Sequence, residues 1–107
     1  MYGDIYYSPQ NHGLEILGEI DYGGAYEFDK LVVWREVETD KVFYGFDSGC
    51  SCPSPFEGFS DVSSLEEVTA LTWPDFKDEI DGWCEHHSDP DSPEKTDLLQ
   101  QVSLLLA

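Results

Sequence analysis

The sequence predicts an α+β fold: a three-stranded antiparallel meander, then a loop that contains Cys and Pro, then two to three helices packed on the sheet. Three observations predict it. Apolar and polar residues alternate within residues 1–47, Gly, Ser and Pro are concentrated in residues 48–63, and apolar residues recur with helical spacing in residues 64–107. The 107 residues suffice for one hydrophobic core, so we expect a single domain over residues 1–107.

The first strand is expected over residues 14–22. Apolar side chains recur there at every second position, as in a strand with one buried face, and Leu17 is the exception. Gly23 and Gly24 follow, and glycine readily takes the positive φ angles of a tight hairpin turn. We therefore expect the chain to reverse here and to continue as a second, antiparallel strand over residues 26–37.

The second strand contains a run, residues 31–34, that is apolar at both parities. A strand of this kind is covered on both faces. A turn over residues 38–41 then leads to a third strand over residues 42–46, which is rich in aromatic and β-branched residues. Residues 48–63 show no sustained period, so we predict a long loop there, with Phe56 and Phe59 packed onto the sheet.

Three helix signals follow in residues 64–107. The first is a capping box at Ser64, whose hydroxyl can accept a helical N–H while Glu67 reaches back. Two longer helices are predicted to begin near Thr72 and Ser92, each with a Pro in its first turn. Their apolar stripes are Trp73, Phe76, Ile80, Trp83, Cys84 and His87 in the former, and Leu98, Leu99, Val102, Leu105 and Leu106 in the latter. We expect these two helices to cover the sheet.

The charge balance defines the class of partner. Five Lys and Arg residues stand against 23 Asp and Glu, which gives a formal net charge of −18 and a pI of about 4.1. Nucleic acids and anionic membranes attract basic surfaces, so we expect no direct nucleic-acid partner and no membrane partner. The sequence has no long apolar run and no signal-peptide pattern at Met1, and its three cysteines are too few for a disulfide scaffold. We therefore expect a cytoplasmic protein.

The helix predicted from Thr72 onward has a strongly acidic polar side. Its carboxylates recur about one turn apart, a spacing of the same order as that of phosphates along a nucleic-acid strand. Such a row could occupy the basic groove of a nucleic-acid-binding protein, or it could be a solvating face that keeps the protein soluble. The candidate partner-binding residues are Asp75, Asp78, Glu79, Asp81 and Glu85. We expect a monomer or a weak dimer that binds a basic protein, with the carboxylates acting as a nucleic-acid mimic.

The cysteines and histidines give an alternative prediction, a small structural zinc or thiol domain. Cys50, Cys52 and Cys84, with His86 or His87, could supply four tetrahedral ligands. Their spacing argues against zinc, because structural sites usually use pairs separated by two to four residues. We therefore predict no cofactor and keep zinc as the alternative.

No motif for catalysis is found. His12 and the many acids could be combined into acid–base pairs on paper, but a nucleophile motif, a glycine-rich phosphate loop and an HExxH helix are all missing from the sequence. We predict no enzymatic activity and no catalytic residue. A third class is a protein–protein module that uses an apolar patch, either the sheet face that bears Trp34 or the Leu-rich C-terminus.

Several segments of the first half resemble a known family. They are Tyr7-Ser-Pro-Gln through His12-Gly-Leu-Glu, Gly18-Glu-Ile-Asp21, Tyr26-Glu-Phe-Asp29, Val32-Val-Trp-Arg35 and Asp47-Ser-Gly-Cys-Ser-Cys-Pro-Ser-Pro-Phe-Glu57. In these segments the chain resembles small uncharacterised proteins of actinobacterial (mycobacterial) phages. The resemblance implies an accessory phage product that acts in the bacterial host cytoplasm and binds a basic host protein, and it implies no catalytic residue.

Overall fold

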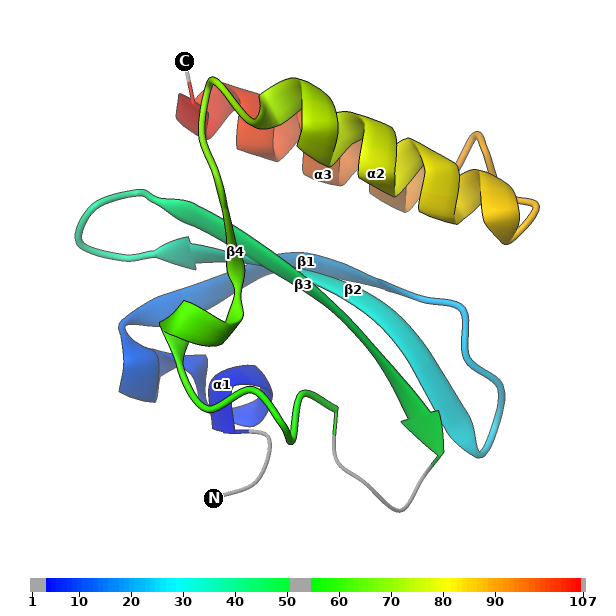
Figure 1. Ribbon diagram of the computed structural model, residues 1–107, viewed down its shortest axis with the longest axis horizontal. Coiled ribbons are helices and arrows are strands. Elements are labelled where there is room, and N and C mark those ends of the chain that lie inside the picture. Colours follow the sequence, from blue (N-terminus) through cyan, green and yellow to red (C-terminus); the bar gives the residue numbers. More distant parts are fainter. Residues whose placement is uncertain (1–3, 51–54, 107) are drawn as a thin grey trace.

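The structure is a four-stranded antiparallel sheet with helices on both faces (Figure 1). A computed structural model describes residues 4–50 and 55–106, apart from the side chain of Cys50. The strands follow the chain across the sheet in the order β1-β2-β3-β4, which confirms the predicted α+β fold and adds a strand to the meander. The elements are α1 (Asp4–Tyr7), the 3-10 helix η1 (Pro9–His12), β1 (Leu14–Asp21), β2 (Glu27–Glu36), β3 (Val42–Cys50), the 3-10 helix η2 (Val62–Ser64), β4 (Glu66–Val68), α2 (Trp73–His86) and α3 (Pro93–Leu106).

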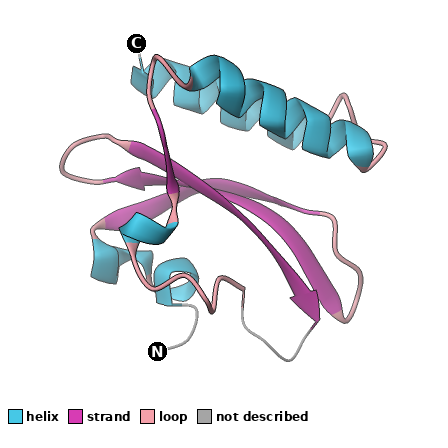
Figure 2. Ribbon diagram, viewed as in Figure 1, coloured by secondary structure: helices cyan, strands magenta, loops and turns pink. Residues whose placement is uncertain are grey.

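Two apolar cores lie on the two faces of this sheet. Figure 2 shows α2 and α3 side by side on one face, as predicted, and the N-terminal turns with the segment before β4 on the other. The helix-side core contains Ile20, Leu31, Val33, Val42, Val68, Phe76, Ile80, Cys84, Leu98 and Val102. The far-side core contains Ile5, Leu14, Val32, Trp34, Phe43 and Phe56.

Strand β2 is the centre of both cores, and its apolar run is buried on both faces as predicted. Leu31 and Val33 belong to the helix-side core, and Val32 and Trp34 belong to the far-side core. The indole N–H of Trp34 donates to the carbonyl oxygen of Ile5 at 3.0 Å, so its one polar atom is satisfied inside the core. Trp34 has no exposed surface, so the predicted apolar patch around it is wrong.

The alternation predicted for the first strand is wrong in its second half, because β1 contains a β-bulge. The pairing of β1 with β2 skips Leu17, between Ile16 and Gly18. One extra residue sends all later side chains to the opposite face. Leu14 therefore lies in the far-side core and Ile20 in the helix-side core, although both have the same parity. Leu17, the exception to the alternation, packs against the helix-side core.

The helix predicted at Ser64 is also wrong. The chain makes only the short 3-10 turn η2 there, with the Asp61 side chain accepting from the N–H of Ser63 at 2.9 Å. Leu65 is extended, and β4 then pairs with the start of β3. Pairing buries Val68 against the sheet, which a free helix at this position would not do. Burial of an apolar side chain and the sheet hydrogen bonds outweigh a local capping signal.

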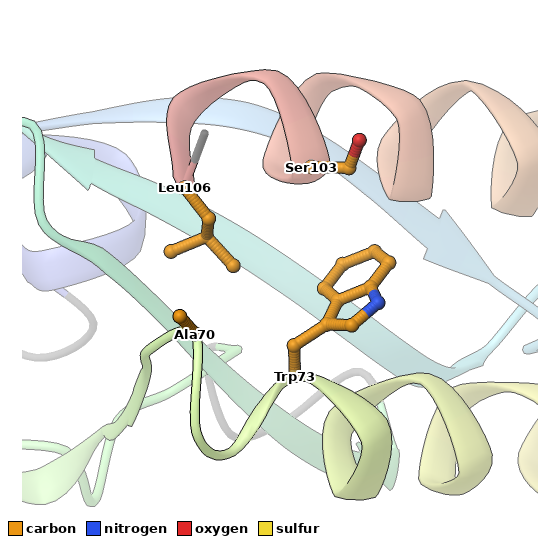
Figure 3. Close-up of a pocket in the computed structure, with 4 residues that line it drawn as sticks. All are labelled: Ala70, Trp73, Ser103 and Leu106. Carbon is orange, nitrogen blue, oxygen red and sulfur yellow. The ribbon is translucent and has the colours of Figure 1, made fainter.

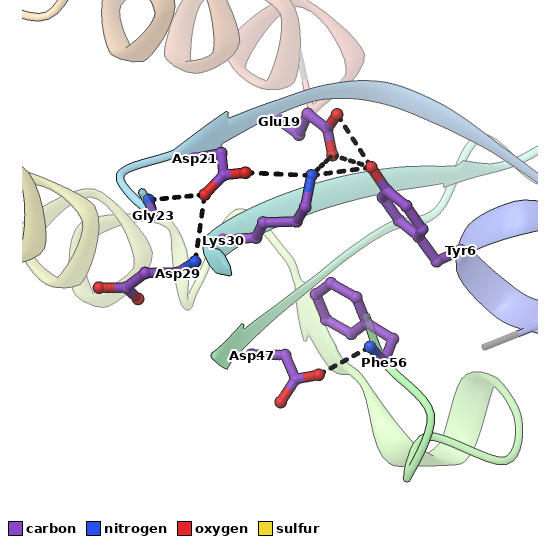
Figure 4. A network of polar contacts seen from close by, with 8 residues as sticks. All are labelled: Tyr6, Glu19, Asp21, Gly23, Asp29, Lys30, Asp47 and Phe56. Atoms are coloured by element: carbon purple, nitrogen blue, oxygen red, sulfur yellow. Dashed lines mark hydrogen bonds and ion pairs between the residues drawn. The ribbon is translucent and has the colours of Figure 1, made fainter. Parts of the chain in front are cut away.

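The far-side core is closed by two segments. The four-residue helix α1 buries Ile5, and it is too short to leave a periodic pattern in the sequence. Strand β3 extends to Cys50, beyond its predicted end, and the chain returns with Phe56 beneath the sheet. Phe56 has a positive φ of 60°, and its N–H donates to the side chain of Asp47 at 2.7 Å (Figure 4). The predicted packing of Phe56 and Phe59 on the sheet is confirmed.

The β1–β2 turn provides a stability test of the fold. A methyl group on Gly23 would lie 2.4 Å from the carbonyl oxygen of Glu27 and 2.5 Å from the Cα of Phe28, and backbone atoms cannot move aside cheaply. We expect Gly23→Ala to lower the free energy of unfolding by about 1–3 kcal/mol, measured by urea denaturation. Gly24→Ala is the control, because its methyl group would make ordinary contacts, and we expect a change within about 0.5 kcal/mol. Equal effects of the two variants would contradict this account of the turn.

Candidate functional site: an acidic helix face

Most of the basic side chains form ion pairs within the molecule. All charged residues lie in the described ranges, and there four of the five basic side chains form ion pairs with carboxylates. Lys30 is the most enclosed example, with its Nζ 2.9 Å from the Tyr6 hydroxyl, 3.3 Å from Glu19 and 3.5 Å from Asp21 (Figure 4). The other pairs are Arg35 with Glu15 and Asp40, Lys77 with Asp81, and Lys95 with Asp81. What remains toward solvent is dominated by carboxylates.

Helix α2 presents its acidic side chains away from the sheet. Phe76, Ile80 and Cys84 face the helix-side core and are buried. The five predicted residues occupy the remaining positions around the helix, and all are exposed except Asp81, which is half-buried. The structure therefore places the five predicted residues on the polar side of one helix, but their contacts divide them into groups.

Asp81 has an internal role. Its carboxylate lies 2.9 Å from the Nζ of Lys77, one turn back on α2, and 3.2 Å from the Nζ of Lys95 on α3. The hydrogen bond from Lys77 is the main cause that lowers the pKa of Asp81, and the second lysine adds to it. Asp81 therefore joins the two helices, and most of its charge is compensated in place.

Glu79 also has an internal role, on the opposite flank of α2. The Tyr44 hydroxyl on β3 donates to its carboxylate at 2.6 Å. Burial raises the pKa of Tyr44 first, and the hydrogen bond to Glu79 and the charges of Glu66 and Asp75 raise it further. The Glu79 carboxylate contacts this hydroxyl, whereas Glu66 and Asp75 act on it through their charges alone. Glu66 was missed by the sequence analysis because β4 was predicted as helix; the pairing of Glu66 with Tyr44 in the sheet places it here.

Asp75, Asp78 and Glu85 remain as the outward carboxylates of α2. Asp75 lies in the first turn, where a negative charge interacts favourably with the helix dipole. Asp78 and Glu85 are seven residues apart, about two turns, so they project from the same side of the helix with about 10 Å between them along its axis. Neither side chain is in a hydrogen bond or ion pair among the described residues, although the hydrogen bond to Asp81 raises the pKa of Lys77 and the charge of Asp78 adds to this effect. Asp78 and Glu85 form the part of the predicted site that is open to a partner.

The end of α2 holds the cysteine and histidine residues considered for zinc. Cys84 is fully buried in the helix-side core, while His86 is exposed. Cys52 and the side chain of Cys50 lie outside the described residues. Within the described part of the chain, no group of three His, Cys, Asp or Glu side chains is arranged to hold a metal ion. The expectation of no cofactor and its zinc alternative both stay predictions.

His87 attaches the end of α2 to the sheet. Its Nδ1 lies 2.9 Å from the carbonyl oxygen of Trp83, its Nε2 lies 2.8 Å from the carboxylate of Asp29 on β2, and its ring stacks on Tyr22 with centroids 4.5 Å apart. Both ring nitrogens face acceptors, which favours the doubly protonated ring. The carbonyl of Trp83 and then the Asp29 carboxylate raise the pKa of His87 against an opposing effect of burial.

A shallow hollow of about 440 Å³ lies between η1 and the β2–β3 turn. His12 lines it, with its Nε2 3.2 Å from the carboxylate of Asp4. The remaining lining residues are Gln10, Gly13, Leu14, Glu36, Val37 and Glu38. The hollow is thus also anionic, which agrees with the character of the rest of the surface. Among the described helices none is long and apolar enough to cross a membrane.

The chain matches a family model. A family model for a domain of unknown function (DUF7574) matches residues 3–106, nearly the whole chain. No curated protein and no solved structure matches the chain significantly. These comparisons therefore assign no role to any residue of the chain.

The His87 contacts predict a pH dependence of stability. Because the folded state raises the pKa of His87, its contribution to stability is complete below the ordinary histidine pKa and is lost as the pH rises through the raised value. We expect His87→Gln to lower the free energy of unfolding more at about pH 5.5 than at about pH 8.5, measured by urea denaturation. His86→Gln, which removes the exposed neighbouring histidine, is the matched control. A loss in His87→Gln that is the same at both pH values would contradict the role of the charged ring.

Proposed function

We propose that this chain, which belongs to the DUF7574 family of domains of unknown function, is a non-enzymatic binding protein that presents carboxylates to a basic partner protein. One observation supports this most: the chain has a net charge of −18, and four of its five basic side chains are in ion pairs within the described structure. A partner therefore meets carboxylates almost wherever it approaches. Cationic surfaces are attracted to such a field and anionic ones are repelled.

The outer side of α2 is the proposed contact surface. Asp78 and Glu85 are exposed and are not in ion pairs, so a partner can bind them without breaking a contact inside the molecule. Asp75 adds a third carboxylate at the start of the helix. Glu79 and Asp81 contribute to the field but are engaged with Tyr44 and with two lysines. Exposed ion pairs contribute only about 0.2–1 kcal/mol each, so affinity would come from several pairs and would fall steeply with salt.

A nucleic-acid-binding protein is the class of partner that fits best. From Asp75 to Glu85 the carboxylates extend over about 15 Å of helix axis, and a groove that binds phosphates offers a row of Lys and Arg over a similar length. The protein would then compete with DNA or RNA for that groove. The phage resemblance adds that the partner is a protein of the bacterial host and that binding takes place in its cytoplasm. Both points remain proposals.

The competing explanation is that the carboxylates only keep the protein soluble. The two explanations differ in where the charge matters. Solubility depends on the total charge, whereas a binding face depends on particular positions. Variants with the same net charge, neutralised at different places, therefore separate them.

The proposed test compares two double variants that each remove two negative charges. Asp78→Asn with Glu85→Gln neutralises the outer side of α2, and Glu27→Gln with Glu38→Gln neutralises two exposed residues beside the hairpin turns. We expect the α2 variant to capture basic proteins from bacterial lysate with about tenfold lower affinity, since two lost ion pairs amount to about 1.4 kcal/mol. The control variant should capture the same proteins nearly as well as the unmodified chain. The measurement is affinity capture at low and high salt with quantitative mass spectrometry, and DNA should displace the captured proteins.

Equal losses in the two double variants would show that only total charge matters. Capture that persists unchanged in high salt would contradict a partner held by carboxylates.

A further inference from the structure

We infer that the basic partner anchors itself through one apolar side chain, which enters a hollow between the start of α2 and the end of α3. This inference rests on the proposed function and names the kind of segment that the partner offers. The hollow has a volume of about 180 Å³ and is lined by Ala70, Trp73, Ser103 and Leu106 (Figure 3). The hollow lies at the same end of α2 as Asp75. None of the five acidic residues of α2 lines it.

The shape of the hollow suits a side chain. Figure 3 shows the indole of Trp73 and the side chain of Leu106 bordering a space that the small residues Ala70 and Ser103 leave open. Sites for small-molecule ligands have volumes of about 300–1,000 Å³, so this one is too small for most of them. Trp73 and Leu106 also pack against the helix-side core, so the apolar walls are held in place.

The rim adds further apolar surface. Leu71 lies in the chain between two lining residues, Ala70 and Trp73, and 92% of its surface is exposed. Leu71 does not itself line the hollow, so it counts as exposed apolar surface of the segment that borders the hollow. Leu104 is also exposed, but on a helix it projects about 160° away from Leu106 and so faces away from the hollow.

Charge decides which occupant fits. A second copy of this chain would bring another net charge of −18 against the same surface, and such copies repel one another. A cationic segment is attracted instead. Asp75 and Asp78 project from the outer side of α2, about 160° and 140° around the helix from Trp73, and Asp78 is about 8 Å along the axis from Trp73. Lys or Arg residues that flank an apolar anchor would therefore meet these carboxylates on the outer side of the helix and not at the hollow itself. The occupant is therefore a cationic segment of the partner with one apolar side chain among its basic residues.

The test uses two synthetic peptides that differ in one residue. Both alternate Lys and Gly, and one carries a single central Leu in place of a Gly. We expect the Leu peptide to bind the full chain about tenfold more tightly in fluorescence anisotropy at low salt, from the burial of one leucine. Ser103→Leu, which fills the hollow from an exposed helix position, should remove this advantage. Gln100→Leu adds the same side chain to an exposed position of α3 that does not line the hollow, and it should leave the advantage intact.

Each other outcome is decisive. If both peptides bind the unmodified chain equally, the anchor is wrong while the proposed function stands. If neither binds at low salt, the proposed function fails as well. If the Leu peptide has no advantage and sedimentation shows dimers that Ser103→Leu dissolves but Leu104→Ser does not, a second copy occupies the hollow and the inference is overturned.

Discussion

The structure depends on the burial of β2 on both faces. The side chains of residues 31–34 point alternately into the two apolar cores, so this strand lies inside the molecule. Each face of the sheet at β2 must therefore be covered by other segments of the chain. The two long helices cover one face, while α1 and the segment around Phe56 cover the other. Because the apolar sides of the helices are used to cover the sheet, the polar sides of the helices are left to face solvent. The acidic side of α2 is thus a direct consequence of how β2 is enclosed.

The distribution of charge follows from the same packing. Lys30, Arg35, Lys77 and Lys95 each lie beside carboxylates of their own sheet or helix layer. The pairs of Lys30, Arg35 and Lys95 join elements that the apolar cores already bring together, whereas Lys77 pairs with Asp81 within α2. Most of the positive charge is therefore used inside the molecule. The outward surface is more uniformly anionic than the composition alone would suggest. The proposed binding function draws on this anionic surface for the attraction of a partner and on the hollow beside Trp73 for an apolar anchor.

Part of the fold and of the candidate site could be predicted from the sequence. The helical spacing in α2 is strong because Phe76, Ile80 and Cys84 face one core, and the same spacing assigns the acids to the other side. The contacts of those acids could not be predicted, because they depend on neighbours that are distant in the chain. Tyr44 reaches Glu79 from β3, and Lys95 reaches Asp81 from α3. Helical periodicity predicts the direction in which a side chain points, but it does not predict which residues of other elements that side chain contacts.

The sequence by itself determined the order and type of the main elements, the double burial of β2 and the anionic character, because each depends on composition or on short-range periodicity. Only the tertiary structure decided the bulge at Leu17, the pairing of β4 where a helical cap was encoded, and the hollow beside Trp73. The physical reason is that a bulge or an added edge strand is stabilised by hydrogen bonds and burial across the sheet, and these outweigh local preferences of a few tenths of a kcal/mol to about 1 kcal/mol. Such contacts exist only once distant segments have met.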